Sequence, residues 1–246
     1  MKRTVKIAVL ASISVVALSL FTVALLLWNG VFYINNPSRE DFPVRGVDVS
    51  AYQGEIDWQT LASQDIEFAF IKATEGSSFT DKCFAYNHRE ALKTDLRVGA
   101  YHFFSFESGG DTQAENFIKA VPKTENMLPP VVDVEFYGNF SAKNVDTVAI
   151  VSELKTMTDA LYEHYGMHPI IYTAEEEYSL FIEGRFESNP IWIRGVYSEP
   201  HISDGRNWNF WQFTNRAKLD GYNGEERFID MNVFNGSLEE FESFGK

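Results

Sequence analysis

The sequence holds little cysteine and no histidine-rich set of metal ligands. Its single cysteine, Cys83, excludes an intramolecular disulfide and any metal site built from cysteines. Cys83 stands beside Phe84 and Tyr86 in a helical pattern, so we interpret it as a packing residue. His102 has no second histidine at metal-ligand spacing, and we interpret it as a hydrogen-bonded structural residue. We therefore expect no metal and no cofactor.

Basic residues are also scarce. The chain has 21 Lys and Arg against 35 Asp and Glu, and residues 1–40 hold four of the basic residues and one of the acids. Residues 41–246 therefore carry 17 basic and 34 acidic residues, a formal charge of −17. Such a surface repels nucleic acid, so we expect no nucleic-acid partner. The length of this part is sufficient for one domain with a sizeable core.

A long uncharged run occupies residues 7–28, which exceeds the roughly 20 apolar residues that span a bilayer. Lys2, Arg3 and Lys6 precede the run, so the positive-inside rule places the N-terminus in the cytoplasm and the rest of the chain outside. A cleaved signal peptide is the alternative, but its apolar part is usually shorter and ends in a small-residue site such as Ala-x-Ala. This run ends instead in Leu-Leu-Leu-Trp-Asn-Gly.

We therefore favour an uncleaved signal anchor over residues 1–28 and a linker over residues 29–43. The remaining residues, 44–246, form the expected domain, in the periplasm or at the cell surface. Secretion is the alternative. The domain contains neither an internal repeat nor a low-complexity stretch.

Short apolar runs recur along the domain and predict strands. Several are continuous rather than alternating, as is typical of parallel strands that are buried on both faces. The eight expected strands are residues 45–49, 67–72, 97–104, 130–136, 168–173, 190–194, 208–213 and 227–234.

Helical patterns lie between the earlier strands. They cover residues 57–62, 81–94, 111–121, with Asp111 as the expected cap, and 143–165. Alternation of strands and helices predicts a parallel α/β sheet, and eight strands suggest a TIM-like barrel. The last strands are joined by short polar segments, so we expect an irregular barrel with helices mainly in its first half.

Two acids interrupt one apolar strand, in the run Val131–Phe136 (VVDVEF). Residues two apart in a strand point to the same face, so Asp133 and Glu135 are expected side by side. Their repulsion and desolvation raise the pKa of at least one carboxyl group. A glycosidase needs this combination of a protonated and an ionised carboxyl group. The alternatives are exposed acids on an edge strand and a metal site.

Other strand ends carry polar or aromatic side chains. Asp48 lies near the end of the first strand and Asp230 lies on the last, and these strands are neighbours in a closed barrel. We expect both acids beside the first pair as supporting carboxylates. Each ring by itself is explained by core packing, but rings and amides on strand ends also suit sugars. The candidate substrate-binding residues are Tyr101, Phe103, Tyr172, Trp192, Trp211 and Gln212, whereas Glu175–Glu177 is interpreted as a solvated face.

An ordered set of short motifs resembles the family-25 glycoside hydrolases, the Chalaropsis-type lysozymes. The resemblance covers about residues 44–235, and its pieces are specific only as a set. They are residues 46–50 (GVDVS), 53–54 (QG), 56–58 (IDW), 70–76 (FIKATEG), 99–103 (GAYHF), 133–135 (DVE), 192–193 (WI), 211–213 (WQF) and 230–234 (DMNVF).

The resemblance implies a lysozyme-type muramidase that cleaves the β-1,4 bond from N-acetylmuramic acid to N-acetylglucosamine in peptidoglycan. It implies Glu135 as general acid, with Asp133 stabilising the transition state as nucleophile or by orienting the substrate's acetamido group. Arg194 departs from the small residue that the family usually has after Trp-Ile. We expect a monomer whose partners are glycan strands and, through the N-terminal helix, the membrane. A non-catalytic peptidoglycan-binding module is one alternative, and a chitinase-like or metal-dependent deacetylase is another.

Overall fold

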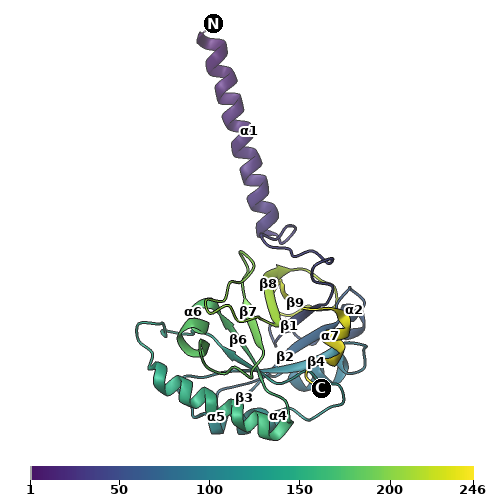
Figure 1. Cartoon of the computed structure of the whole chain (residues 1–246). Helices are drawn as coiled ribbons and strands as arrows, with labels where there is room; N and C mark the ends of the chain where they lie inside the picture. The colour runs from purple at the N-terminus through teal and green to yellow at the C-terminus, as the bar shows by residue number, and fades with distance from the viewer. Residues whose placement is uncertain (1) are drawn as a thin grey trace.

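Eight strands close into a barrel in the computed structural model, which describes the backbone of residues 2–246 and the side chains of residue 5 and residues 7–246 (Figure 1). The order around the barrel is β1-β9-β8-β7-β6-β5-β4-β2, and a parallel β1–β2 pairing closes it. The short β3 (Phe79–Thr80) pairs with β2 outside the ring. The eight expected strands are confirmed as β1 (Arg45–Val49), β2 (Phe68–Glu75), β4 (Arg97–Phe103), β5 (Val131–Val134), β6 (Ile170–Ala174), β7 (Ile191–Arg194), β8 (Phe210–Ala217) and β9 (Ile229–Phe234).

The last strand runs against the rest of the barrel. β9 is antiparallel to both β8 and β1, while the other barrel pairings are parallel. The expectation of a parallel sheet is therefore wrong for β9. Residues 218–228, all of which the structure describes, form no helix, and a parallel return needs a crossover of a dozen or more residues.

Helices cover mainly the first half of the barrel, as expected. Asp146 caps α5 (Thr147–Tyr165), because its carboxylate accepts hydrogen bonds from two backbone N–H groups of the first turn. The expected cap at Asp111 is wrong: Gly109 is the cap and Asp111 lies inside the first turn. The helices are α2 (Trp58–Ala62), α3 (Phe84–Ala91), α4 (Gly110–Ala120), α5 (Thr147–Tyr165), α6 (Glu175–Glu177) with the π-helical η1 (Tyr178–Ile182), and α7 (Leu238–Ser243).

Large apolar side chains fill the barrel interior at the end where the parallel strands begin. Alternate residues of each strand point inward, so Phe68 and Phe70 enter the interior while Ala69 and Ile71 face the helices. Gly46 makes room for this filling, since a Cβ there would lie 2.4 Å from the ring of Phe68. α7 closes this end through Phe241, which packs in the same cluster. The opposite end, where the parallel strands finish, remains available for a site.

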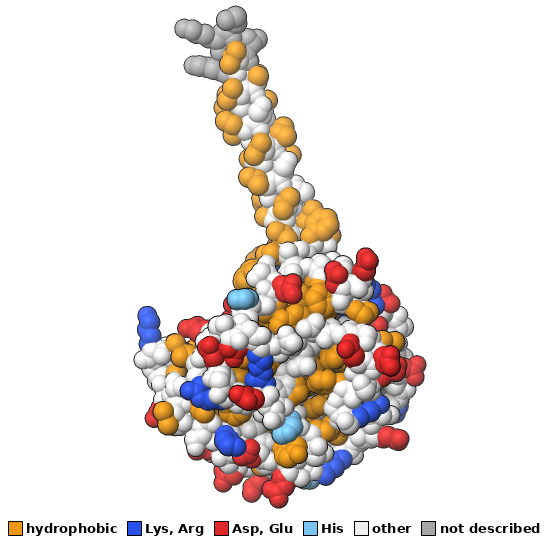
Figure 2. Space-filling model, viewed as in Figure 1, with side chains coloured by type: hydrophobic (Ala, Val, Ile, Leu, Met, Phe, Trp, Pro, Cys, Tyr) orange, Lys and Arg blue, Asp and Glu red, His pale blue; other side chains and the backbone are white. Residues whose placement is uncertain are grey.

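The N-terminal helix α1 (Lys2–Trp28) projects away from the barrel (Figure 1). By length and composition, its part Ile7–Trp28 is able to cross a membrane. Figure 2 shows hydrophobic side chains along this helix and acidic side chains spread over the visible face of the barrel. Residues 29–44 connect the helix to β1 without helix or strand.

Candidate active site

A cavity of about 370 Å³ opens at the carboxyl ends of the parallel strands. Its floor follows from the inward alternation, because the last inward residue of each strand reaches it. Thus Phe68 and Phe70 of β2 are followed by Lys72, and Val131 of β5 is followed by Asp133. The lining residues include Asp48, Ser50, Tyr52, Gln53, Lys72, Tyr101, Phe103, Asp133, Glu135, Tyr172, Trp192, Gln212, Asn215, Glu226, Phe228 and Asp230.

The structure brings Asp133 and Glu135 to the same cavity. Asp133 lies in β5 and is 7% exposed, whereas Glu135 follows one residue after the strand ends at Val134. The expected strand to residue 136 is therefore too long, but the backbone stays extended enough for both acids to face the cavity. Asp133 Oδ1 is buried and has no hydrogen-bond partner among the described residues. Burial, and secondarily the charge of Glu135, holds the pKa of Asp133 well above its usual range, and Lys72 opposes the shift.

Glu135 is tuned for proton transfer near neutrality. Burial raises its pKa from 4.5 to about 7. Glu177 and Asp48 add to the rise through their negative charges, while the positive charge of Arg194 opposes it. A carboxylic acid with this pKa holds a proton at neutral pH and can also release it, as a general acid must.

A second pair of acids lies across the cavity floor. Asp48 and Asp230 are directly opposite in the β1–β9 ladder. Because β9 is antiparallel, Asp230 reaches this end of the barrel from the start of its strand. Gln212 Nε2 donates to Asp48 Oδ2 at 2.9 Å and to Asp230 Oδ2 at 3.1 Å. Asn232 Nδ2 donates to Asp48 Oδ2 at 2.8 Å, so amide groups hold this acid pair together.

Two aromatic side chains orient those amides. The Tyr172 hydroxyl donates to Gln212 Oε1 at 3.0 Å, and Trp192 Nε1 donates to Asn232 Oδ1 at 2.9 Å. Each amide oxygen is thereby occupied, which leaves its NH₂ group to face the carboxylates. Burial nevertheless raises the pKa of Asp48, and burial together with the charge of Asp48 raises that of Asp230 well above its usual range. The site therefore concentrates carboxyl groups whose neutral forms are favoured by burial.

The predicted aromatic residues divide into two groups. Tyr101, Phe103, Tyr172 and Trp192 line the cavity, and Gln212 lies there as well. Trp211 does not: it is buried on the other side of β8, donates from Nε1 to the carbonyl of Gly195, and packs against Trp208 and Phe42. Its expected role in substrate binding is withdrawn, because adjacent residues of a strand face opposite sides.

Sequence reasoning missed Glu177 and Lys72. Glu177 was placed on a solvated face, but it is 7% exposed and its Oε1 accepts from the backbone N–H of Phe136 at 3.1 Å. Glu175 and Glu176 are exposed, as expected. No local pattern distinguishes Glu177 from these neighbours. Lys72 was recoverable, because it continues the inward alternation of Phe68 and Phe70.

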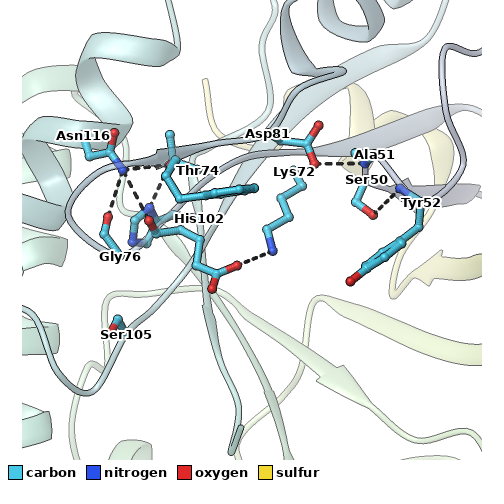
Figure 3. Close-up of polar contacts among 12 residues, drawn as sticks. Ser50, Ala51, Tyr52, Lys72, Thr74, Gly76, Asp81, His102, Ser105 and Asn116 are labelled. Carbon is cyan, nitrogen blue, oxygen red and sulfur yellow. Dashed lines mark hydrogen bonds and ion pairs between the residues drawn. The ribbon is translucent and has the colours of Figure 1, made fainter. Parts of the chain in front are cut away.

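Polar contacts hold the loops at the rim of the cavity (Figure 3). Lys72 Nζ lies 2.8 Å from Glu75 Oε2 and 5.0 Å from the centre of the Phe103 ring. His102 Nδ1 lies 2.7 Å from Thr74 Oγ1, and its Nε2 lies 3.1 Å from Gln113 Oε1. Burial lowers the pKa of the His102 imidazole to about 4, so the His102 ring is neutral at physiological pH. The interpretation of His102 as a hydrogen-bonded structural residue is confirmed.

Arg194 ends β7 and is the family departure seen in the sequence. Its charge lowers the pKa values of Asp48, Glu135 and Asp230. It therefore favours the ionised forms of acids that burial drives toward neutrality. No group of three or more His, Cys, Asp or Glu side chains with the arrangement of a metal site occurs in the described part of the chain.

Comparison with known proteins agrees with this geometry. Residues 47–222 match the model of the glycosyl hydrolases family 25. A solved family 25 glycosyl hydrolase from Bacillus anthracis shares 51% identity, covers 86% of this chain and 97% of its own, and superposes with a TM-score of 0.81. The uncharacterized protein YegX of Escherichia coli K12 is 36% identical over 208 residues, 82% of this chain and 74% of its own. Lysozyme M1 of Streptomyces globisporus is 31% identical over 208 residues, 79% and 68% of the two chains.

Proposed function

Since the chain belongs to glycosyl hydrolase family 25, we propose that it is a lysozyme-type muramidase. It hydrolyses the β-1,4 bond between N-acetylmuramic acid and N-acetylglucosamine in peptidoglycan. The observation that carries this proposal is the placement of Asp133 and Glu135 on one cavity, with the pKa of Glu135 at about 7. The similarity to a protein named as a lysozyme supports the choice of substrate.

In this proposal Glu135 donates its proton to the glycosidic oxygen as the bond breaks. The sugar then carries positive charge, which the ionised form of Asp133 stabilises. Burial favours the neutral form of Asp133, so substrate binding has to promote its ionisation. An acetamido N–H that donates to this carboxylate has that effect, because a hydrogen bond to the charged form lowers a pKa. Asp133 acts either as nucleophile or by orienting the acetamido group.

The remaining groups support the reacting pair. In their ionised forms, which the charge of Arg194 favours, Asp48 and Asp230 add negative potential to the floor on which the positive sugar forms. Tyr101 and Phe103 offer rings at the cavity wall for the apolar faces of sugars. We also propose that the barrel works outside the cytoplasm, because α1 is suited to export or anchoring.

Product analysis tests the proposal. Purified peptidoglycan is digested with the protein, and the new reducing ends are identified by mass spectrometry after borohydride reduction. Reduced muramic acid is expected. Reduced glucosamine would instead indicate a glucosaminidase, and wall binding without any new reducing end would indicate a non-catalytic binding module.

A further inference from the structure

The end of α1 is fastened to the end of β8 and to the connection between β8 and β9. The guanidinium of Arg216 donates to the backbone carbonyls of Leu27, at 3.4 Å from Nε, and of Trp28. Carbonyls in the last turn of a helix lack partners within the helix, and a cation there also opposes the negative end of the helix dipole. Arg227 adds a hydrogen bond of 2.6 Å to Asn29 Oδ1. The helix end is therefore held by two cations of the barrel.

The chain leaves the helix along the barrel surface. Gly30 is buried and has a φ of +65°, and a Cβ there would lie 2.4 Å from the Arg216 carbonyl oxygen. Only glycine permits this turn against the barrel. Further along, Asn35 Nδ2 donates to the carbonyl of Gly195 at 3.1 Å, and the Phe42 ring stacks 5.8 Å from that of Trp208. The linker thus contacts the barrel at Gly30, Asn35 and Phe42.

The end of β8 and the connection that follows it also form a wall of the active-site cavity. Asn215 and Phe228 line the cavity, and Arg216 follows Asn215 directly. The Arg216 guanidinium lies 4.4 Å from the centre of the Phe228 ring and 5.4 Å from that of Trp28. The side chains of Arg216 and Phe228 therefore separate Trp28 from the cavity. Figure 1 shows the helix meeting the barrel near β8 and β9.

An apolar collar surrounds the end of α1 and the residues that follow it. We define it as Trp28, Val31, Phe32 and Ile34, which are 69%, 56%, 58% and 64% exposed. Exposed apolar side chains that continue a membrane-crossing segment suit the lipid interface, where tryptophan is enriched. Since the barrel carries an excess of acids, general charge attraction does not favour contact with anionic lipid, and the collar is the surface suited to it.

We propose that α1 is not cleaved off and that it holds the barrel against the non-cytoplasmic face of the membrane that it crosses. The collar then lies in the lipid interface, and the cavity lies at the height of the bilayer surface. Its substrate is then the membrane-proximal part of the glycan, in strands that are still linked to a membrane lipid. The cleavage chemistry rests on the proposed muramidase function, whereas the membrane docking does not.

Docking is tested without any catalysis. The full chain is reconstituted in phosphatidylcholine vesicles, and its fluorescence is compared in ordinary and brominated lipid. We expect bromine to quench Trp28 and the Trp28→Phe variant to lose that quenching, because the other four tryptophans lie in the barrel. Equal quenching of the two proteins would overturn the proposal. So would the finding that the protein isolated from cells has been cleaved and lacks residues 1–28.

The height of the cavity above the membrane is inferred from the length of glycan that the protein leaves on a lipid. The same vesicles carry glycan strands attached to a lipid, and the length of glycan left on the lipid is measured. The comparison variant combines Arg216→Gln with an insertion of about 20 Gly and Ser residues after Asn29, which spans ~25 Å as a flexible coil. Arg89→Gln, an exposed arginine on α3, is the matched control.

The intact protein and Arg89→Gln are expected to leave short remnants of narrow length distribution, and the insertion variant longer and broader ones. Identical remnants from all three proteins would refute the proposed height. Detached soluble glycan serves as the reference substrate, and all three proteins should cleave it within about twofold of one another. If the intact protein does not cleave soluble glycan, the muramidase function is contradicted, but the quenching result remains valid evidence for membrane docking.

Discussion

Replacement of Glu135 by glutamine tests the reaction and the electrostatics of the site together. The amide is nearly isosteric but cannot donate the catalytic proton, so the release of reducing ends should fall by about 10²–10⁴-fold, the usual contribution of a general acid. The same change should stabilise the fold at neutral pH. Burial raises the pKa of Glu135 from 4.5 to about 7, so the folded protein binds this proton more tightly than the unfolded chain does.

The sign of the pH dependence follows from that difference. Below pH 4.5 the group is protonated in both states, and its ionisation has no effect on the free energy of unfolding. As the pH rises to about 7, the unfolded chain ionises freely while the folded protein resists, so the wild type loses stability. A shift from 4.5 to about 7 corresponds to about 3 kcal/mol, because one unit is 1.36 kcal/mol. Glu135→Gln does not incur this loss.

The assay is urea unfolding of both proteins in the same detergent, followed by tryptophan fluorescence from pH 4 to pH 8. The stability difference should be near its minimum at pH 4 and grow to as much as about 3 kcal/mol in favour of Glu135→Gln at pH 8. Glu176→Gln, an exposed acid nearby, is the control and should show no such trend. A difference that stays constant with pH would refute the assigned pKa, and a fully active Glu135→Gln would refute the catalytic role.

Three further predictions concern the pKa of Glu135, the packing of the barrel interior and the absence of a metal requirement. Glu177→Gln keeps an acceptor for the Phe136 N–H but removes a charge that raises the pKa of Glu135, so the alkaline limb of the kcat/KM profile should move to lower pH; an unmoved limb would exclude Glu177 from this role. Gly46→Ala forces a Cβ to 2.4 Å from the Phe68 ring and should cost about 1–3 kcal/mol in urea unfolding, whereas an unchanged midpoint would contradict the described packing. Prolonged treatment with a strong chelator should leave the hydrolysis rate unchanged, and a loss that zinc or magnesium restores would point to a metal-dependent enzyme.

Features that depend on neighbouring residues in the chain were predictable. Apolar runs identified the eight barrel strands, and the two-residue spacing of Asp133 and Glu135 placed both acids on one side, because strand geometry fixes the relative direction of such neighbours. The apolar run of residues 7–28 likewise identified α1, since a helix of that length needs no tertiary partner to be recognised. The capping role of Asp111 failed because the turn before it supplies Gly109 instead.

Other features depend on which segments meet in space. The direction of β9, the bridge from Gln212 to Asp48 and Asp230, and the buried Glu177 behind Phe136 all join residues that are far apart in the sequence. Alternation along β8 shows that Gln212 and Trp211 face opposite sides, but it does not tell which side is the barrel interior. Only closure of the sheet decides that, because closure determines which face of each strand the neighbouring strands enclose.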